Sequence, residues 1–493
     1  MRVPRIIVSF LKNHVFLILI ATWSSLLADS TYIVTRPPML SQEFGKLRAG
    51  DTLLIMPGQY AYVPSMTSQY DGLPDHRIVI RATAPNTVFI IHGHEELFMM
   101  YHRYYTFENL NIAGLDGVAN CHFKLNERAQ YIHIRNCKLT QFGETFIKAG
   151  AMNTTPDSIF PGDYSIIDGC DISSSVLGLN GNGNGFNLNG PEHMVIRNNW
   201  VHDLVRTQGS TAGDPTYAGF FKAGAQHNIL EGNVFGPGVG MAFCFGGGCT
   251  GVSFFRLARS FETNDIMYRN NVVLYCNTVE FTCGTNLERK LYHNTIISSS
   301  GSLVAADCRN NLVMGGNVSL PANGVNNFKN TTYNAALFWA PSSRNFALKS
   351  TATTLIGQVP RLDSVLFDAM GTARPEMVSY GAYEAYEENP FIAVETIESA
   401  MPEVSFLEIH PNPANPSATI DFQLERDMRY VEIGIYDFSG RTVRVLYDGP
   451  RSAGRYSIQW DGQSHTSKTA SGTYFVRIRS NDRQVCKRFV FIR

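Results

Sequence analysis

A short pattern of apolar and polar positions recurs between about residues 105 and 315. Each copy has an apolar residue, a charged residue, an Asn or Gly, and a second apolar residue three positions later, as in "TFENLNI", "HIRNCKL", "VIRNNWV" and "MYRNNVV". The pattern predicts a short strand, a tight turn and another short strand in every copy. No helical period separates the copies, which excludes alternating strands and helices. The aligned turn residues are Asn109, Asn136, Gly169, Asn198, Gly232, Asn270, Asn294 and Asn310.

The columns beside the turn predict how the copies stack. The apolar columns are expected to face inward, and the column before the turn alternates in charge. Strands about 4.8 Å apart would convert this alternation into cross-strand ion pairs. A further column, Asn199, Asn233, Asn271 and Asn311, predicts a ladder of side-chain amides. A solenoid of parallel strands satisfies all of these columns. The charged column reads Glu108, Arg135, Asp168, Arg197, Glu231, Arg269, His293 and Arg309.

The repeat resembles the right-handed parallel β-helix of the pectate lyase, chondroitinase B and alginate lyase superfamily. The resemblance covers roughly residues 31 to 330, and Asn345 to Glu384 resembles the closing segment that often follows such repeats. We therefore expect an all-β protein with a right-handed parallel β-helix over residues 29–388, followed by a small β-sandwich. A fold does not fix an activity.

The composition changes near Val404. The segments "PNP", "IYDFSGR", "WDG" and "SGTYFVRI" separate alternating strands over about 90 residues, which predicts the β-sandwich. Their order resembles the C-terminal sorting domain of the type IX secretion system, which is also similar to the FlgD immunoglobulin-like module. The resemblance implies that residues 404–493 engage the type IX secretion machinery, with 389–403 as a linker. The alternative is an ordinary accessory sandwich.

The N-terminus and the composition predict where the chain acts. Arg2, Arg5 and Lys12 precede the apolar run Val15 to Ala21, which is too short to span a membrane and predicts a signal peptide over residues 1–28. A secreted protein, or one on the outer-membrane cell surface, is expected. The 41 Lys and Arg against 42 Asp and Glu give no support to a nucleic-acid partner. A monomer is expected. Of the nine cysteines, Cys137 and Cys170 are predicted to be buried thiols.

Lysines mark one column of the repeat. "GFNLNGPEHMVIRNNWV" and "GFFKAGAQHNILEGNVF" align without a gap, which places Lys222 at the position of Leu188. "FIKAGA" and "FFKAGA" make Lys148 equivalent to Lys222, with Lys124 close to the same column. A lysine cannot face an apolar interior unpaired, so this column is expected outside. Three interpretations of this lysine column stay open. The lysines are ordinary surface residues, they form a basic stripe that holds an acidic polysaccharide, or one of them is a lyase base.

The resemblance bears on the third alternative. In chondroitinase B and alginate lyase relatives, a lysine and an arginine of the next coil abstract a proton and neutralise a carboxylate beside calcium. Lys222 resembles that lysine, but the next coil, "AFCFGGG", has no arginine. The predicted catalytic residues are Lys222, Arg256 and His227, and the predicted substrate-binding residues are Lys148, Lys222 and Arg259. The function stays open between lyase-type cleavage of an acidic polysaccharide and a non-catalytic adhesin or glycan-binding surface protein.

Calcium would require clustered oxygen ligands. The candidates come from adjacent coils, and the alternative for them is ion pairs and turn caps. A polygalacturonase-like hydrolase ranks lower, because the chain has no Asp-Asp dipeptide. The predicted calcium ligands are Glu192, Asp203, Asp214 and Glu231.

Overall fold

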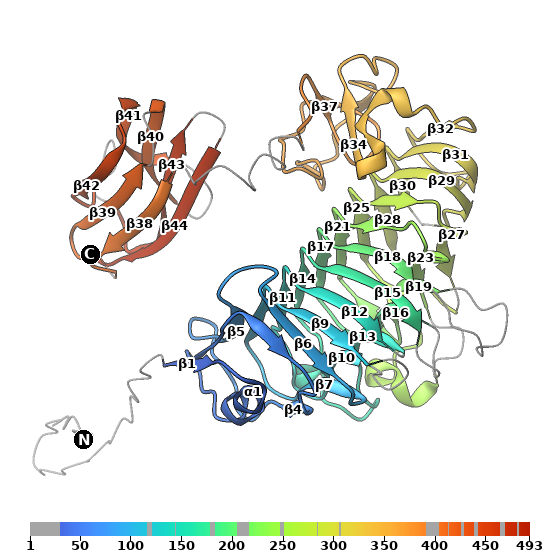
Figure 1. The fold of residues 1–493 in the computed structure, drawn as a ribbon. Helices are drawn as coiled ribbons and strands as arrows, with labels where there is room; N and C mark the ends of the chain where they lie inside the picture. The colour runs from blue at the N-terminus through green and yellow to red at the C-terminus, as the bar shows by residue number, and fades with distance from the viewer. Residues whose placement is uncertain are drawn as a thin grey trace, which may run out of the picture. The chain divides into compact units, whose positions relative to one another are not determined.

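The computed structural model describes residues 30–115, 121–142, 144–177, 183–204, 216–246, 251–282, 284–304, 307–390, 404–412, 414–424, 428–437, 442–463, 469–480 and 483–493. The predicted signal peptide and nearly all of the predicted linker lie outside these ranges. The chain divides into two compact units, residues 1–389 and 390–493 (Figure 1). In the described part of the chain, no helix has the length and apolar character needed to cross a bilayer.

The first unit is a right-handed parallel β-helix with three long sheets, here called sheets A, B and C. The coils from β2 to β27 visit the sheets in that order, and the last coils have strands in sheets A and B. Sheet A contains β1 (Thr31–Val34), β2 (Thr52–Ile55), β5 (Ile78–Ala82), β8 (Tyr105–Glu108), β11 (His133–Arg135), β14 (Ile166–Asp168), β17 (Val195–Arg197), β21 (Ile229–Glu231), β25 (Ile266–Arg269), β28 (Arg289–Tyr292) and β30 (Asp307–Arg309). Sheet B contains β3 (Gly58–Tyr60), β6 (Val88–His92), β9 (Asn111–Gly114), β12 (Lys138–Phe142), β15 (Asp171–Leu177), β18 (Trp200–Leu204), β22 (Val234–Phe235), β26 (Val272–Leu274), β29 (Thr295–Ser302), β31 (Leu312–Ser319) and β32 (Phe328–Asn330). Sheet C contains β4 (Met66–Thr67), β7 (Glu96–Met100), β10 (Cys121–Leu125), β13 (Thr145–Ala149), β16 (Asn184–Asn189), β19 (Tyr217–Lys222), β23 (Met241–Phe245) and β27 (Thr278–Thr282).

Shorter elements close the unit. Helix α1 (Pro37–Phe44) lies at the N-terminal end of the β-helix and buries Leu40 and Phe44 in its core (Figure 1). The small strands are β20 (Ala225–Gln226) with β24 (Thr263–Asn264), β33 (Phe338–Ala340) with β34 (Asn345–Lys349) and β37 (Ala385–Tyr386), and β35 (Val359–Pro360) with β36 (Met377–Val378). The 3₁₀ helices are η1 (Asp157–Ile159), η2 (Val252–Phe254), η3 (Arg256–Ala258), η4 (Ala335–Leu337) and η5 (Pro341–Ser343).

The predicted inward column is confirmed except in one coil. The predicted turn at Asn294 would place Tyr292 in the inward column, but Tyr268 pairs with Leu291, and Leu291 pairs with Cys308. His293 therefore occupies the left-handed turn position, with φ of 54°, that was assigned to Asn294. A one-residue shift exchanges the two faces of a strand, so the aliphatic Leu291 enters the core and Tyr292 points outward to bond Asp307.

The asparagine ladder is confirmed and is longer than predicted. The Nδ2 of Asn199 donates to the Oδ1 of Asn233 at 3.0 Å, and the same bond continues from coil to coil. The shift described above places Asn294 in this ladder. The further steps are Asn233 to Asn271 at 2.9 Å, Asn271 to Asn294 at 3.2 Å, Asn294 to Asn311 at 2.9 Å, and Asn311 to Asn327 at 2.8 Å.

The charge ladder exists as separate pairs. Three of the arginines contact the acidic residue of the preceding coil, whereas Arg309 lies beside Tyr292, which replaces the predicted His293 in the column, and bonds Asp307 of its own strand. The pairs are Arg135 with Glu108 at 3.5 Å, Arg197 with Asp168 at 2.8 Å, and Arg269 with Glu231 at 2.5 Å. The predicted thiols Cys137 and Cys170 are buried and free.

The second unit has two antiparallel sheets. One contains β38 (Val404–His410), β39 (Ala418–Leu424) and β42 (Gly454–Trp460), and the other contains β40 (Met428–Asp437), β41 (Thr442–Arg451), β43 (Gly472–Ser480) and β44 (Arg483–Phe491). Both sheets contribute to one core, in which Ile420, Ile435 and Trp460 are buried. This is the predicted β-sandwich.

Candidate functional site

Polar side chains gather on the outer face of sheet C. Strands β10, β13, β16 and β19 turn Phe123, Ile147, Phe186 and Phe221 into the core, so the alternate residues point outward. We call this surface the lysine face and define it as Lys124, Lys148, Asn187, Asn189 and Lys222.

The strand register corrects the predicted equivalence of the lysines. Lys124 pairs with Lys148, and Lys148 pairs with Asn187. Lys222 pairs instead with Asn189, because Leu188 pairs with Phe221 at an offset of 33 residues. Further along the same coil, Glu192 is bridged to Gln226, an offset of 34. The extra residue lies between Lys222 and Gln226, so a gapless alignment misplaces everything before it. Lys148 and Lys222 lie in different columns of the same face.

The three lysines differ in their partners. The Nζ of Lys124 lies 2.7 Å from Glu96, and that of Lys148 lies 3.1 Å from Glu144. Within the described part of the chain, no carboxylate lies within ion-pair distance of the Lys222 Nζ, which is 5.1 Å from the centroid of the Phe220 ring. Among the described residues, Lys222 is therefore the lysine of this face that has no ion pair.

The surroundings of Lys222 make it easier to deprotonate. Burial lowers the pKa of Lys222, and the nearby ammonium of Lys148 acts in the same direction, while Glu262 opposes it. Glu262 is itself buried and accepts a hydrogen bond from the backbone N–H of Ala223 at 2.7 Å. A lysine with a lowered pKa has more of the neutral amine that a general base requires.

Two asparagines complete the polar surface. The Oδ1 atoms of Asn187 and Asn189 are buried and have no hydrogen-bond partner among the described residues. Both come from β16, and Asn189 pairs directly with Lys222. Buried acceptors are normally satisfied, so these two enclosed oxygens are exceptions on this face.

Arg256 is buried and has a structural role. Its side chain is 1% exposed and lies 4.6 Å from the ring of Phe160. The Nη1 and Nη2 atoms bond the two carboxylate oxygens of Asp163 at 2.8 and 3.0 Å, and Nε bonds Asp157. The predicted catalytic role is not supported, because a polysaccharide cannot reach a guanidinium enclosed by carboxylates.

Arg259 lies beside this network. Its Nη2 atom is 2.5 Å from Glu192, and its Nη1 atom donates to the carbonyl of Gly224 at 2.7 Å. The side chain is 16% exposed. The predicted substrate-binding residue is therefore already paired, and Glu192, a predicted calcium ligand, is its partner.

His227 belongs to a stack of rings at the turns between sheets C and A. It lies 5.2 Å from His193, and its Nδ1 atom is 2.8 Å from Asp265. The backbone of His227 is left-handed, with φ of 56°. Its ring contacts are those of a repeated turn residue, which does not support the predicted catalytic role. The stack consists of Tyr104, Tyr131, Tyr164, His193 and His227, with ring centroids 4.5 to 5.2 Å apart.

The predicted calcium ligands do not come together in the described structure. Asp203 bonds His202 at 2.7 Å, Glu231 pairs with Arg269, and Glu192 pairs with Arg259. Asp214 lies outside the described residues. Among the residues that are described, no group of three or more His, Cys, Asp or Glu is arranged to hold a metal ion.

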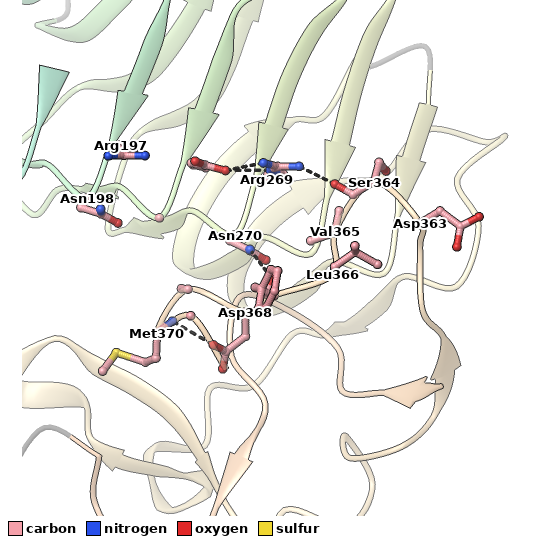
Figure 2. Close-up of a pocket in the computed structure, with 15 residues that line it drawn as sticks. Arg197, Asn198, Arg269, Asn270, Asp363, Ser364, Val365, Leu366, Asp368 and Met370 are labelled. Atoms are coloured by element: carbon pink, nitrogen blue, oxygen red, sulfur yellow. Dashed lines mark hydrogen bonds and ion pairs between the residues drawn. The ribbon is translucent and has the colours of Figure 1, made fainter. Parts of the chain in front are cut away.

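A cavity that the sequence did not indicate lies elsewhere on the β-helix. It has a volume of about 760 Å³ and is formed by the ends of sheet A strands and residues 363–371 (Figure 2). Asn270 and Arg374, 104 residues apart in the chain, are hydrogen-bonded beside it. No local pattern reports such a contact.

The comparisons with known proteins bear on both units. Residues 408–492 match the family described as the secretion system C-terminal sorting domain. The C-terminal unit is therefore a type IX secretion sorting domain. A sorting domain of this kind directs its protein to secretion or to attachment at the cell surface. No curated protein matches the chain.

Solved structures support the fold of the first unit. The chain is similar to pectate lyase Pel9A, with 13% identity, a TM-score of 0.52 and coverage of 73% of this chain and 97% of that one. It also matches an alginate lyase from Paenibacillus sp. at 13% identity, with a TM-score of 0.37 and coverage of 62% and 99%. The similarity to pectate lyase Pel9A supports the parallel β-helix and, at 13% identity, leaves the activity to the residues of the site.

Proposed function

We propose that the protein binds an acidic polysaccharide on the lysine face and cleaves it by β-elimination, with Lys222 as the base. The observation that carries this proposal is the Lys222 ammonium, which is partly buried and has no carboxylate partner among the described residues. Its lowered pKa favours the neutral amine that a general base requires.

In the proposed reaction, neutral Lys222 takes the proton from the carbon next to the uronate carboxylate. The electron pair of that C–H bond forms a double bond to the neighbouring carbon, and the bond from this carbon to the glycosidic oxygen breaks. The departing oxygen takes up a proton from solvent. Lys148 contributes a weaker attraction, because Glu144 already compensates its charge.

Binding without cleavage is the second candidate function. It is favoured by the state of the two predicted arginines, since Arg256 and Arg259 are both engaged with carboxylates. β-Elimination requires a cation that stabilises the charge developing on the uronate carboxylate. Lys222 cannot be that cation while it acts as a neutral base.

Substitution of Lys222 distinguishes the two candidates. Lys222→Ala should lower the turnover of polygalacturonate or alginate by about 10²-fold or more, while the affinity falls only slightly. The measurement is the ultraviolet absorbance of the unsaturated uronate product, together with calorimetric binding. Lys124→Ala, which removes a paired lysine from the same face, is the matched control. Wild-type protein that binds either polymer without forming this product would establish the non-catalytic function. Failure to bind any uronate polymer would exclude both.

Calcium dependence stays a separate proposal. Three of the four predicted ligands are in separate ion pairs, so the described residues do not fit a calcium site. Chelation with EDTA checks this directly. Unchanged binding and thermal stability after chelation would exclude a resident calcium ion, and a loss restored by added Ca²⁺ would require one.

A further inference from the structure

The 760 Å³ cavity introduced above lies on the turns that follow sheet A, away from the lysine face on sheet C. Its floor comes from β17, β21 and β25, and its wall is the loop of residues 363–371. Figure 2 shows Arg197 and Asn198 at the end of one strand and Met370 on the loop that faces them.

The wall is held rigidly in place. Arg269 donates to the carbonyl of Ser364, and the Nδ2 of Asn270 donates to the carbonyl of Phe367 at 2.8 Å. Within the loop, the buried carboxylate of Asp368 accepts bonds from the backbone N–H groups of Met370 and Thr372, each at 2.9 Å. The cavity is therefore formed before a ligand arrives, which lowers the entropic cost of binding.

The charges of the cavity do not suit a polyanion. Arg197 donates two bonds to Asp168, and the Nε of Arg269 donates to the Oε2 of Glu231 at 2.9 Å. The lining holds two arginines and three acidic residues, so positive charge is not in excess. Within the described structure, the Oε1 of Glu231 accepts no hydrogen bond, and the side chains of Arg197 and Glu231 are 37% and 26% exposed. Neutral groups that both donate and accept hydrogen bonds, such as sugar hydroxyls, match this floor.

The wall adds an apolar surface. Three exposed apolar side chains are clustered in this one short loop: Leu366, Phe367 and Met370 are 45%, 55% and 38% exposed. Exposed apolar groups beside fixed polar ones are typical of ligand sites, and an aromatic ring can pack against the C–H face of a sugar. We propose that this cavity binds a neutral oligosaccharide, with its hydroxyls on Arg197 and Glu231 and one sugar face on Phe367. The site is separate from the proposed uronate site and does not depend on it.

Isothermal titration calorimetry of the full chain tests this proposal. The probes are xylohexaose, cellohexaose and mannohexaose. We expect at least one of them to bind with a Kd of about 1 mM or below, and the Kd to change less than about twofold when NaCl rises from about 50 to 500 mM. Phe367→Ala should weaken this binding about tenfold or more. Its backbone carbonyl, which holds the loop, is retained.

The matched control is Phe89→Ala, which removes a 48% exposed phenylalanine from β6 on sheet B and should leave the Kd unchanged. The proposal is overturned if none of the three hexasaccharides binds, if Phe367→Ala binds as the wild type does, or if the affinity falls steeply with salt. Uronate binding or turnover by Phe367→Ala should remain at the wild-type level, so failure here leaves the proposed function intact.

Discussion

The chemistry of a lysine on this protein depends on its immediate neighbours. Lys124, Lys148 and Lys222 lie on one sheet face, but two of them have a carboxylate at ion-pair distance. Lys222 is instead set beside Phe220, and its burial lowers its pKa with help from the ammonium of Lys148, although Glu262 and Glu144 oppose the shift. This position therefore has more of the neutral amine that the proposed base requires.

The pH dependence of turnover should report the influence of Lys148 on Lys222. Lys148→Ala removes a cation that lowers the pKa of Lys222 and frees Glu144, which raises it. Both effects raise that pKa, so the rise of kcat/KM with pH should move to higher pH. Lys124→Ala is the control, since Lys124 has its own partner and is expected to leave the profile in place. A profile that stays fixed or moves to lower pH in Lys148→Ala would contradict the assignment of Lys222 as the base.

At the scale of elements, the coils are joined by polar ladders as well as by their core. The buried asparagines link each turn to the next through both side-chain and backbone bonds. Such a ladder fixes the register, because a shift by one residue would leave every amide without its partner. The coil that contains His293 shows the same constraint. Asn294 joins the ladder, and His293 takes the turn position that was predicted for Asn294.

Removing one amide from the ladder should be costly. The Oδ1 of Asn271 accepts from the backbone N–H of Asn233 at 3.0 Å, and its Nδ2 donates to the carbonyl of Leu230 at 2.9 Å. Asn271→Ala leaves these buried groups without partners and should lower the free energy of unfolding by about 2 kcal/mol or more. Asn317→Ala, at an exposed position of β31, should change it by less than about 0.5 kcal/mol. Denaturant titration followed by circular dichroism measures both, and equal losses would refute a structural ladder.

At the scale of the whole molecule, the two units have separate cores and separate tasks. The β-helix carries both candidate binding surfaces, whereas the sandwich matches a sorting domain. The contacts that define each core stay within its own unit. Folding and export should therefore be separable.

Deletion of residues 404–493 should leave a folded β-helix that is not exported. The truncated chain should keep the thermal transition of the first unit and its polysaccharide binding when purified from cells, because its core is complete. Cell fractionation measures its location. Efficient release of the truncated protein into the medium would contradict the sorting role, and a chain that fails to fold would contradict the independence of the units.

Buried histidines should make the β-helix less stable in acid. Burial lowers the pKa of His92 to about 4, of His133 to about 3 and of His293 to about 2, from a usual 6.5. Below pH 6.5 the unfolded chain binds protons that the folded chain cannot, so stability is fully present above pH 6.5 and falls as the pH drops toward these values. At pH 5.5 each histidine should cost about 1.4 kcal/mol.

Burial raises the pKa of Asp163 from 3.8 to about 6. Between these values the folded chain binds a proton at Asp163 that the unfolded chain does not, so this one group opposes the loss of stability in acid. The melting temperature should therefore fall between about pH 7 and 5.5, and His133→Gln should reduce that fall. A melting temperature that is constant or rises over this interval would show that the histidines do not control acid stability.

The sequence by itself determined the repeat, the parallel strands, the inward columns and the sorting domain. Each of these features follows from a local alternation of apolar and polar residues, which decides which side chains of a strand face the core. It also determined that the lysines of sheet C face outward. Tertiary structure decided what periodicity leaves open. One residue inserted after Lys222 moved the lysines into different columns, and a choice between Leu291 and Tyr292 for the core moved the turn to His293. Ion pairs between distant segments enclosed Arg256, and a loop from the closing segment formed a cavity on sheet A. The first two outcomes depend on how a strand packs against the neighbouring coil, and the last two depend on side chains that meet across more than 90 residues of chain. No local pattern encodes either kind of meeting.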